Sequence, residues 1–131
     1  MFSGSIPKAF LNISKLLTLD ISNNQLTGFI PKTLSNLTEL ESLDLSHNIL
    51  SGEIPPQLLE LTFLEVFSVA YNNLSSRIPN IRAQFETYDA SRYEGNPFLC
   101  GLPLEKNCTR RVTEQIIDQF NYIICSIKKF T

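Results

Sequence analysis

Two aspartates, Asp20 and Asp44, have the spacing that comes nearest to suggesting acid–base chemistry in this chain. A pair of carboxylates on either side of a bond is the usual machinery of glycoside hydrolysis. Here the two aspartates lie in similar short segments, TLDIS and SLDLS, at the same place in consecutive repeats. Each is therefore one copy of a repeated exposed position, and the pattern predicts no cleft that would remove water from the pair.

Thiol and metal chemistry have little support in the sequence. The chain contains three cysteines, Cys100, Cys108 and Cys125, and one histidine, His47. Two sulfurs cannot complete a zinc shell, and His47 is far from them in the sequence. Cys125 has no nearby base that would make it a nucleophile. With no Gly-rich phosphate loop and no cluster of ligands, the sequence predicts a protein that is not an enzyme and that uses no cofactor or metal.

Composition narrows the class of partner. The chain has 131 residues, of which 43% are hydrophobic, which is sufficient for one small domain with a core. Its net charge is −2, and 18% of its residues are charged. Phosphate binding needs a concentrated basic face, so this balance argues against a nucleic-acid partner.

A 24-residue repeat runs from the beginning of the chain to Pro79. Two full copies and two partial ones are apparent: Ser3 to Ser14 (partial), Leu16 to Glu39, Leu40 to Phe63, and Leu64 to Pro79 (partial). A fixed period of this length, with apolar residues at a fixed phase, is typical of a solenoid. The first copy lacks its strand half, and the sequence shows no signal peptide and no membrane span. We therefore expect a fragment of a longer array, in which the repeats continue before residue 1.

Each copy predicts one coil of the solenoid. Alternation at Leu43 and Leu45 predicts a short strand, and stacked coils would pair such strands in parallel. A glycine and the dipeptide Ile-Pro then predict turns, since proline ends strand pairing. Leucines at a spacing of three, such as Leu58 and Leu61, predict one short helical turn on the outer, convex side.

An asparagine follows each predicted strand at the same phase. These are Asn24, Asn48 and Asn72. An amide at this position can bond backbone groups of its own turn and of the next coil, which would otherwise be buried without partners. We expect these three residues to form a structural ladder rather than a ligand site.

The repeat pattern LxxLxLxxNxLSGxIPxxLxxL resembles the plant-type leucine-rich repeat of extracellular receptor-like kinases, receptor-like proteins and cell-wall inhibitor proteins. The match covers Ser3 to Pro79, and the segment YEGNPFLCGLPL, beginning at Tyr93, resembles the C-terminal cap of those ectodomains. The resemblance implies an α/β leucine-rich repeat solenoid with short parallel strands on a concave face, Ile-Pro turns, short helical turns on the convex side and a C-terminal cap.

The cap is expected where the repeat phase fails, after Pro79. We place the repeats at residues 1–79, the capping region at 80–108 and a separate tail at 109–131. In the family the two cap cysteines form a disulfide, which implies a bond between Cys100 and Cys108; free thiols in a cytosolic protein are the alternative. Ala83, Phe85, Tyr88 and Tyr93 are expected to cover the last coil.

Four sequons for N-linked glycosylation indicate passage through the secretory route. Their acceptor residues are Asn12, Asn36, Asn73 and Asn107. The first two are one repeat apart, so we expect them at equivalent convex positions of successive coils. The Asn107 sequon is the weakest of the four because Cys108 lies inside it.

The outward side chains of the strand face are the candidate ligand contacts. Those that alternate with the core residues include Ser46, Ser68 and Ala70, but most of them repeat the family consensus. The positions that vary between coils form the predicted binding face: Thr18, Asn23, Ser42, His47, Val66 and Tyr71. Three strands at about 4.8 Å spacing make a face only about 10 Å across, which is small for a selective protein interface.

The tail has apolar residues at helical spacing, from Val112 to Ile127, which predicts an amphipathic helix. It is expected either to dock against the solenoid, to lie on a membrane surface or to have no selected structure.

The resemblance implies a non-catalytic recognition module, the membrane-proximal end of a plant receptor-like protein ectodomain. Such receptors perceive peptide or microbial ligands in defence or developmental signalling and work with a co-receptor kinase. They lie at the extracellular face of the plasma membrane. The alternatives are a secreted leucine-rich repeat inhibitor of a microbial wall-degrading enzyme and a truncated gene product without independent function.

Overall fold

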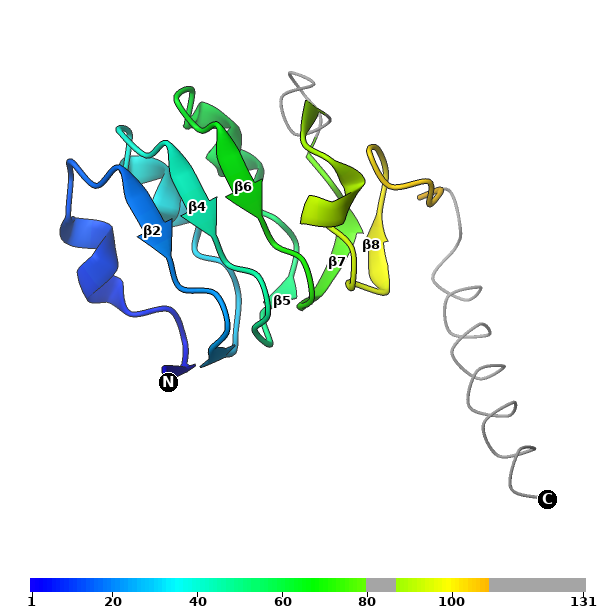
Figure 1. Cartoon of the computed structure of the whole chain (residues 1–131), viewed down its shortest axis with the longest axis horizontal. Helices are drawn as coiled ribbons and strands as arrows, with labels where there is room; N and C mark the ends of the chain where they lie inside the picture. Colours follow the sequence, from blue (N-terminus) through cyan, green and yellow to red (C-terminus); the bar gives the residue numbers. More distant parts are fainter. Residues whose placement is uncertain (80–86, 109–131) are drawn as a thin grey trace.

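Three short parallel strands line one face of the molecule. The computed structural model describes residues 1–79 and 87–108. Within these ranges β2 (Thr18–Asp20), β4 (Ser42–Asp44) and β6 (Val66–Ser68) lie side by side (Figure 1). Thr18 pairs with Ser42 and Ser42 pairs with Val66, so each strand is one full repeat beyond its neighbour. The predicted parallel pairing is confirmed.

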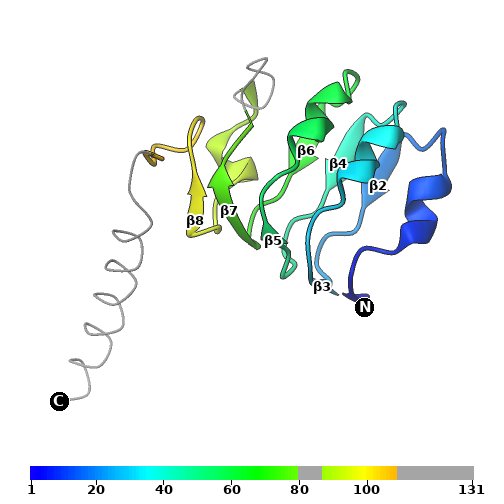
Figure 2. The same ribbon diagram turned by 180° about the vertical axis from the view of Figure 1, so that it is seen from behind.

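The opposite face carries one short 3-10 helix per coil. These are η1 (Lys8–Asn12), η2 (Lys32–Asn36) and η3 (Pro56–Glu60), and Figure 2 shows them in front of the strands. Each begins directly after a proline in an extended conformation, with φ of −71° at Pro31. Proline fixes φ and lacks a donor, so it suits the residue before a helix. The single helical turn predicted from Leu58 and Leu61 is confirmed.

A second set of strand pairs lies between the strand face and the helices. β3 (Gln25–Leu26) pairs with β1 (Ser3–Gly4), and β5 (Ser51–Gly52) pairs with β7 (Asn73–Arg77), which in turn pairs with β8 (Phe98–Cys100). The sequence indicated only turns here. Such very short strands leave no alternating pattern, so nothing in the period-2 signal reveals them.

The core is a set of columns in which each residue stacks on its equivalent in the next coil. Leu26, Leu50 and Leu74 form one column and are fully buried. A second column of Ile30, Ile54 and Ile78 is at most 3% exposed. Burying a leucine or isoleucine side chain contributes roughly 1.5–3 kcal/mol, so these columns help to hold the coils together.

The predicted asparagine ladder is confirmed, with a correction to its direction. Asn48 Nδ2 donates to the carbonyls of Leu45, in its own turn, at 3.1 Å and of Ile21 at 3.0 Å. Its Oδ1 accepts from the Leu26 N–H at 3.0 Å. Ile21 and Leu26 belong to the preceding coil, not to the next one as expected. The amide therefore satisfies a backbone N–H and a backbone carbonyl of the coil before its own.

A fourth asparagine, Asn96, continues the ladder into the cap. Its Oδ1 accepts from the Leu74 N–H at 2.9 Å and its Nδ2 donates to the Val69 carbonyl at 3.0 Å. The Val69 N–H bonds the Arg92 carbonyl, just as the Leu45 N–H bonds the Ser68 carbonyl one coil earlier. We expected the repeat phase to fail after Pro79. This expectation is wrong for residues 92–96 of the capping region, which resume the phase.

Two tyrosines close the core at the cap end. Tyr93 is fully buried, and its ring lies 6.0 Å from that of Phe67. Burial raises the pKa of the Tyr93 hydroxyl well above its ordinary value. The Tyr88 ring also contacts Phe67, and its hydroxyl donates to the Leu64 carbonyl at 2.7 Å. Both residues thus cover the last coil as predicted, whereas Ala83, Phe85 and the predicted tail helix lie outside the described residues.

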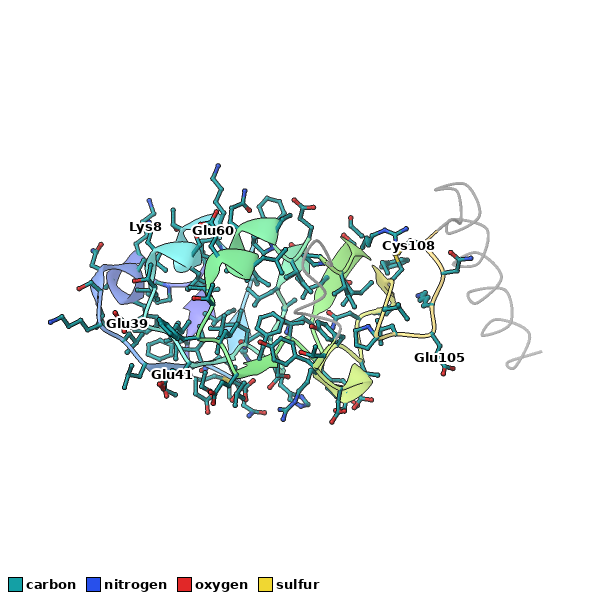
Figure 3. All side chains as sticks on the ribbon, turned by 90° about the horizontal axis from the view of Figure 1, so that it is seen from above. Lys8, Glu39, Glu41, Glu60, Glu105 and Cys108 are labelled. Atoms are coloured by element: carbon teal, nitrogen blue, oxygen red, sulfur yellow. A yellow bond between two sulfur atoms is a disulfide. The ribbon has the colours of Figure 1, made fainter. Side chains whose placement is uncertain are left out.

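The expected disulfide joins Cys100 and Cys108. Cys100 is buried at the end of β8, next to β7, and Figure 3 shows Cys108 at the cap end of the molecule (Figure 3). The bond ties the chain that follows the last strand to the solenoid. The two cysteines are separated by 8 positions in the sequence, a short loop for which closure is worth roughly 2–3 kcal/mol.

Candidate recognition face

The strand face places the six candidate residues in two rows. The first row runs across the strands themselves, with Thr18, Ser42 and Val66 in register. Thr18 and Val66 are exposed, and Ser42 is half-buried. The second row, Asn23, His47 and Tyr71, lies at the turn after each strand and is exposed throughout. The six residues thus recur at two equivalent positions of successive coils. Their role as a binding face stays a prediction.

The second row has a backbone conformation that the sequence analysis missed. Asn23, His47 and Tyr71 all have positive φ, between 57° and 58°. This left-handed region is uncommon for residues other than glycine and asparagine. Each N–H of the row bonds a carbonyl of the following coil, for example His47 N–H to Ala70 at 2.9 Å, which holds the turn in place. The turn is thus set by the stacking of coils and not by the preference of the residue.

Gly95 is the fourth member of this row. It lies one repeat beyond Tyr71 and has a φ of 78°. A Cβ added at this glycine would lie 2.3 Å from Tyr71 Cδ1. Glycine therefore leaves the space in which the Tyr71 ring rests. Extending the phase of the repeat into the cap segment EGNP would have revealed both Gly95 and Asn96.

Two members of this row, His47 and Tyr71, form a stacked pair of rings. The rings of His47 and Tyr71 are stacked, with centroids 4.7 Å apart and planes inclined by 16°. The Tyr71 hydroxyl donates to Glu94 Oε1 at 3.1 Å. This hydrogen bond and the negative charge of Glu94 raise the pKa of the Tyr71 hydroxyl above its ordinary value. The stack therefore presents a fixed aromatic surface, held by Gly95 below it and by Glu94 at its edge.

The two aspartates of the face support the turns. Asp20 Oδ1 accepts from both the N–H and the hydroxyl of Ser22, at 3.1 and 2.6 Å. Asp44 and Ser46 repeat this arrangement. The bonds from Ser22 lower the pKa of Asp20 below its ordinary value. Each aspartate closes its own turn, which agrees with the interpretation of the pair as copies of one structural position.

Three residues expected on the outward face are buried. Ser46, Ser68 and Ala70 are between 5% and 9% exposed. In each case the backbone beside the residue is paired with the following coil. Ser46 lies between the bonds of Leu45 to Ser68 and of His47 to Ala70. Ser68 and Ala70 lie beside the bonds of Val69 to Arg92 and of Tyr71 to Glu94 in the cap. The usable face is therefore narrower than alternation alone indicated, and it ends against the cap.

The four predicted glycosylation sites have exposed asparagine side chains. Asn12 and Asn36 are the last residues of η1 and η2, so they occupy equivalent positions on the face opposite the strands. Asn73 begins β7, and Asn107 precedes the disulfide-bonded Cys108. Their use as glycosylation sites stays a prediction.

Within residues 1–79 and 87–108, no group of three or more His, Cys, Asp or Glu side chains is arranged to hold a metal ion. Over the same residues, none of the helices has the length and the apolar character that crossing a membrane requires.

Comparison with known proteins relates the chain to plant receptors. The leucine rich repeat family profile matches residues 6–50. Cuscuta receptor 1 of Solanum lycopersicum is 59% identical over 29 residues, which is 22% of this chain and 3% of that protein.

Solved structures from Arabidopsis thaliana resemble the chain over most of its length. A chain of the BIR3–SERK2 complex has a TM-score of 0.75 and 40% identity, covering 82% of this chain and 56% of that one. The BIR2 ectodomain has a TM-score of 0.75 and 45% identity, covering 81% and 55%. The present chain thus spans little more than half of these relatives. Its fold is a leucine-rich repeat solenoid that is similar to these plant receptor ectodomains.

Proposed function

We propose that the chain is a non-catalytic recognition module of a plant receptor, located at the extracellular face of the plasma membrane. It binds an extended peptide or protein segment on the strand face and works with a co-receptor kinase. The similar solved structures include GASSHO1/SCHENGEN3 in complex with CASPARIAN STRIP INTEGRITY FACTOR 2, and HAESA in complex with the peptide hormone IDA and the co-receptor SERK1. These likenesses support the class of ligand and partner.

The observation that carries the proposal is that the recurring residues and the variable residues of each coil lie on opposite sides of its backbone. Residues that recur unchanged, such as Asn48 and Asn72, face inward and satisfy the backbone. Residues that differ, such as His47 and Tyr71, face outward on a frame that holds their turns fixed. Preorganised side chains cost less entropy on binding, which favours recognition.

A binding role also fits the state of the polar groups on this face. Asp20 and Asp44 have their Oδ1 atoms engaged by neighbouring serines. The His47 ring is stacked on the ring of Tyr71. General acid–base catalysis requires a titratable group within hydrogen-bond reach of a reacting atom in a plausible pose. The described residues offer polar and aromatic contacts for a ligand instead.

Selection of peptides tests the binding face. A phage library of random dodecapeptides is selected on the full chain, secreted with a heterologous leader. Enriched peptides are then measured by biolayer interferometry against Val66→Arg, on the strand face, and against Gln57→Arg, which makes the same charge change at an exposed residue of η3. We expect Val66→Arg to weaken binding at least tenfold and Gln57→Arg to leave it unchanged. Equal effects of the two variants, or no enrichment, would refute a peptide site on this face.

The co-receptor interaction is tested separately with the SERK2 ectodomain as the probe. We expect the immobilised full chain to bind it in a saturable manner, and the disulfide-free variant Cys100→Ser/Cys108→Ser to bind more weakly if the cap is unfolded. Absence of saturable binding to the SERK2 ectodomain would contradict this partner while leaving the peptide result unaffected.

A further inference from the structure

A groove of about 500 Å³ lies between the first two coils, on the side away from the strand face. Lys8, Leu11 and Asn12 line it from the first coil. Thr33 and Asn36, both in η2, line it from the second. Figure 3 places Lys8 and Glu60 along the helical side and Glu41 along the opposite side, so this groove is well separated from the candidate recognition face.

Phe29 is the aromatic residue among those that line this groove. Its side chain is 74% exposed, although it is a large aromatic residue. A Cβ added at Gly52 would lie 2.6 Å from Phe29 Cδ1, so the ring rests over the glycine of the third coil. The ring is thus supported by the solenoid and still presents most of its surface. A fixed, exposed aromatic ring of this kind is a platform for an apolar ligand surface.

Asn36, which lines the groove, is also a possible attachment point for a covalent substituent. It belongs to the sequon Asn36-Leu37-Thr38, and its side chain is exposed. The neighbouring groove over Gly52 and Glu53 shares Phe29 but is not lined by Asn36. A substituent on Asn36 Nδ2 therefore starts in the first groove. Pro31, close to Phe29 along the chain, is separated from Asn36 by the length of η2, or about 10 Å of 3-10 helix.

We propose that the first sugars of an N-linked glycan on Asn36 lie in this groove and pack against Phe29. N-acetylglucosamine has a face of C–H groups that suits an aromatic ring, and its hydroxyl and acetamide groups suit polar neighbours such as Thr33 and Lys8. The glycan then covers an aromatic side chain that otherwise faces water. A glycan at Asn36 requires entry of the chain into the secretory route but does not depend on ligand binding at the strand face.

The two residues are tested by a double-mutant cycle in glycosylated protein. The full chain, Phe29→Ala, Asn36→Gln and the double variant are secreted from plant cells, and mass spectrometry measures the occupancy of Asn36. We expect Asn36→Gln to lower the Tm by about 3 °C when Phe29 is present and by less than about 1 °C when it is absent. Equal losses in both backgrounds, or an unoccupied Asn36, would overturn the proposal.

Asn12→Gln is measured alongside, since Asn12 occupies the equivalent position of the preceding coil and also lines the groove. Asn73→Gln is the matched control, since Asn73 is an exposed sequon asparagine at the start of β7 and is not among the residues that line the groove. We expect it to leave the coupling between Phe29 and Asn36 intact. A coupling that follows Asn12 instead would refute the assignment to Asn36. Phe29→Leu, which keeps an apolar side chain but removes the ring, replaces Phe29→Ala if that variant fails to fold, and the same loss of coupling is expected.

Discussion

At the scale of single residues, the turn after each strand accounts for the chemistry of the recognition face. The same left-handed conformation is occupied by Asn23, His47, Tyr71 and Gly95 in successive coils. A histidine or a tyrosine in this region of φ is less stable by about 1 kcal/mol than an asparagine or a glycine. The fold accepts this cost at the two positions where the rings stack. Strain at these positions is a reason to regard the pair as functional.

Gly95 allows the steric part of this arrangement to be measured. Gly95→Ala adds a Cβ 2.3 Å from Tyr71 Cδ1 and 2.9 Å from Tyr71 Cα, at a φ of 78°. Gly28 has nearly the same φ, 80°, but its added Cβ meets only Ser5 Cβ at 4.0 Å. We expect Gly28→Ala to cost about 1 kcal/mol and Gly95→Ala to cost at least about 2 kcal/mol more. Guanidinium denaturation measures both, and equal losses would show that Tyr71 does not rest on Gly95.

Asp20 gives a prediction for pH. Hydrogen bonds from Ser22 lower the pKa of Asp20 in the folded protein. A lowered folded pKa means that the stabilisation is present above the unfolded pKa, near about 4, and is lost as the pH falls through the folded value. We therefore expect Asp20→Asn to reduce the fall in Tm between pH 6 and pH 3. Thermal melts of the two proteins at each pH measure this, and parallel curves would contradict it.

At the scale of elements, the sequence predicted the features whose residues recur at a fixed phase in every coil. It missed the features that have no recurring residue pattern. The strands, the asparagine ladder and the helical turns follow from the phase of Leu43, Asn48 and Leu58, because each satisfies the same local need in every coil. The short β5 and the positive φ of His47 leave no pattern of polarity, since neighbouring coils impose them. The resumed phase at Asn96 was present in the sequence but hidden by the break in the repeat pattern before it.

Asn96 shows that the cap is a further coil in physical terms. It is 5% exposed and makes bonds to Leu74 and Val69 of the preceding coil. Asn96→Ala leaves these groups buried without partners, and we expect a loss of about 3 kcal/mol in the free energy of unfolding. At the other end Asn24 is half-exposed and bonds the exposed Phe2 N–H. Asn24→Ala should cost about 1 kcal/mol, and a similar cost for both in urea denaturation would show that the cap is not part of the ladder.

At the scale of the whole molecule, the solenoid is a line of coils in which each contacts only its neighbours. Stability in such an array is close to a sum of the stability of each coil and of each interface. β4 has a paired strand on both sides, whereas β2 pairs with one strand only within the described residues. The third coil should therefore be the most stable part, and the recognition face should be firmest at Ser42 and His47, which belong to it.

Matched core substitutions test this gradient. Leu43 in β4 is fully buried between two strands, and Leu19 in β2 is 7% exposed at the equivalent position. Leu43→Ala should cost about 3–5 kcal/mol and Leu19→Ala about 2 kcal/mol in the free energy of unfolding, because the edge relaxes into the space more easily.

Native-state hydrogen exchange should show the slowest amides at Leu45 and His47, which bond the next coil, and faster exchange at Gln25 and Thr27, which bond the first coil. Uniform exchange across these four amides would mean that the array unfolds as one unit, and a ligand at the strand face would then stabilise all coils equally.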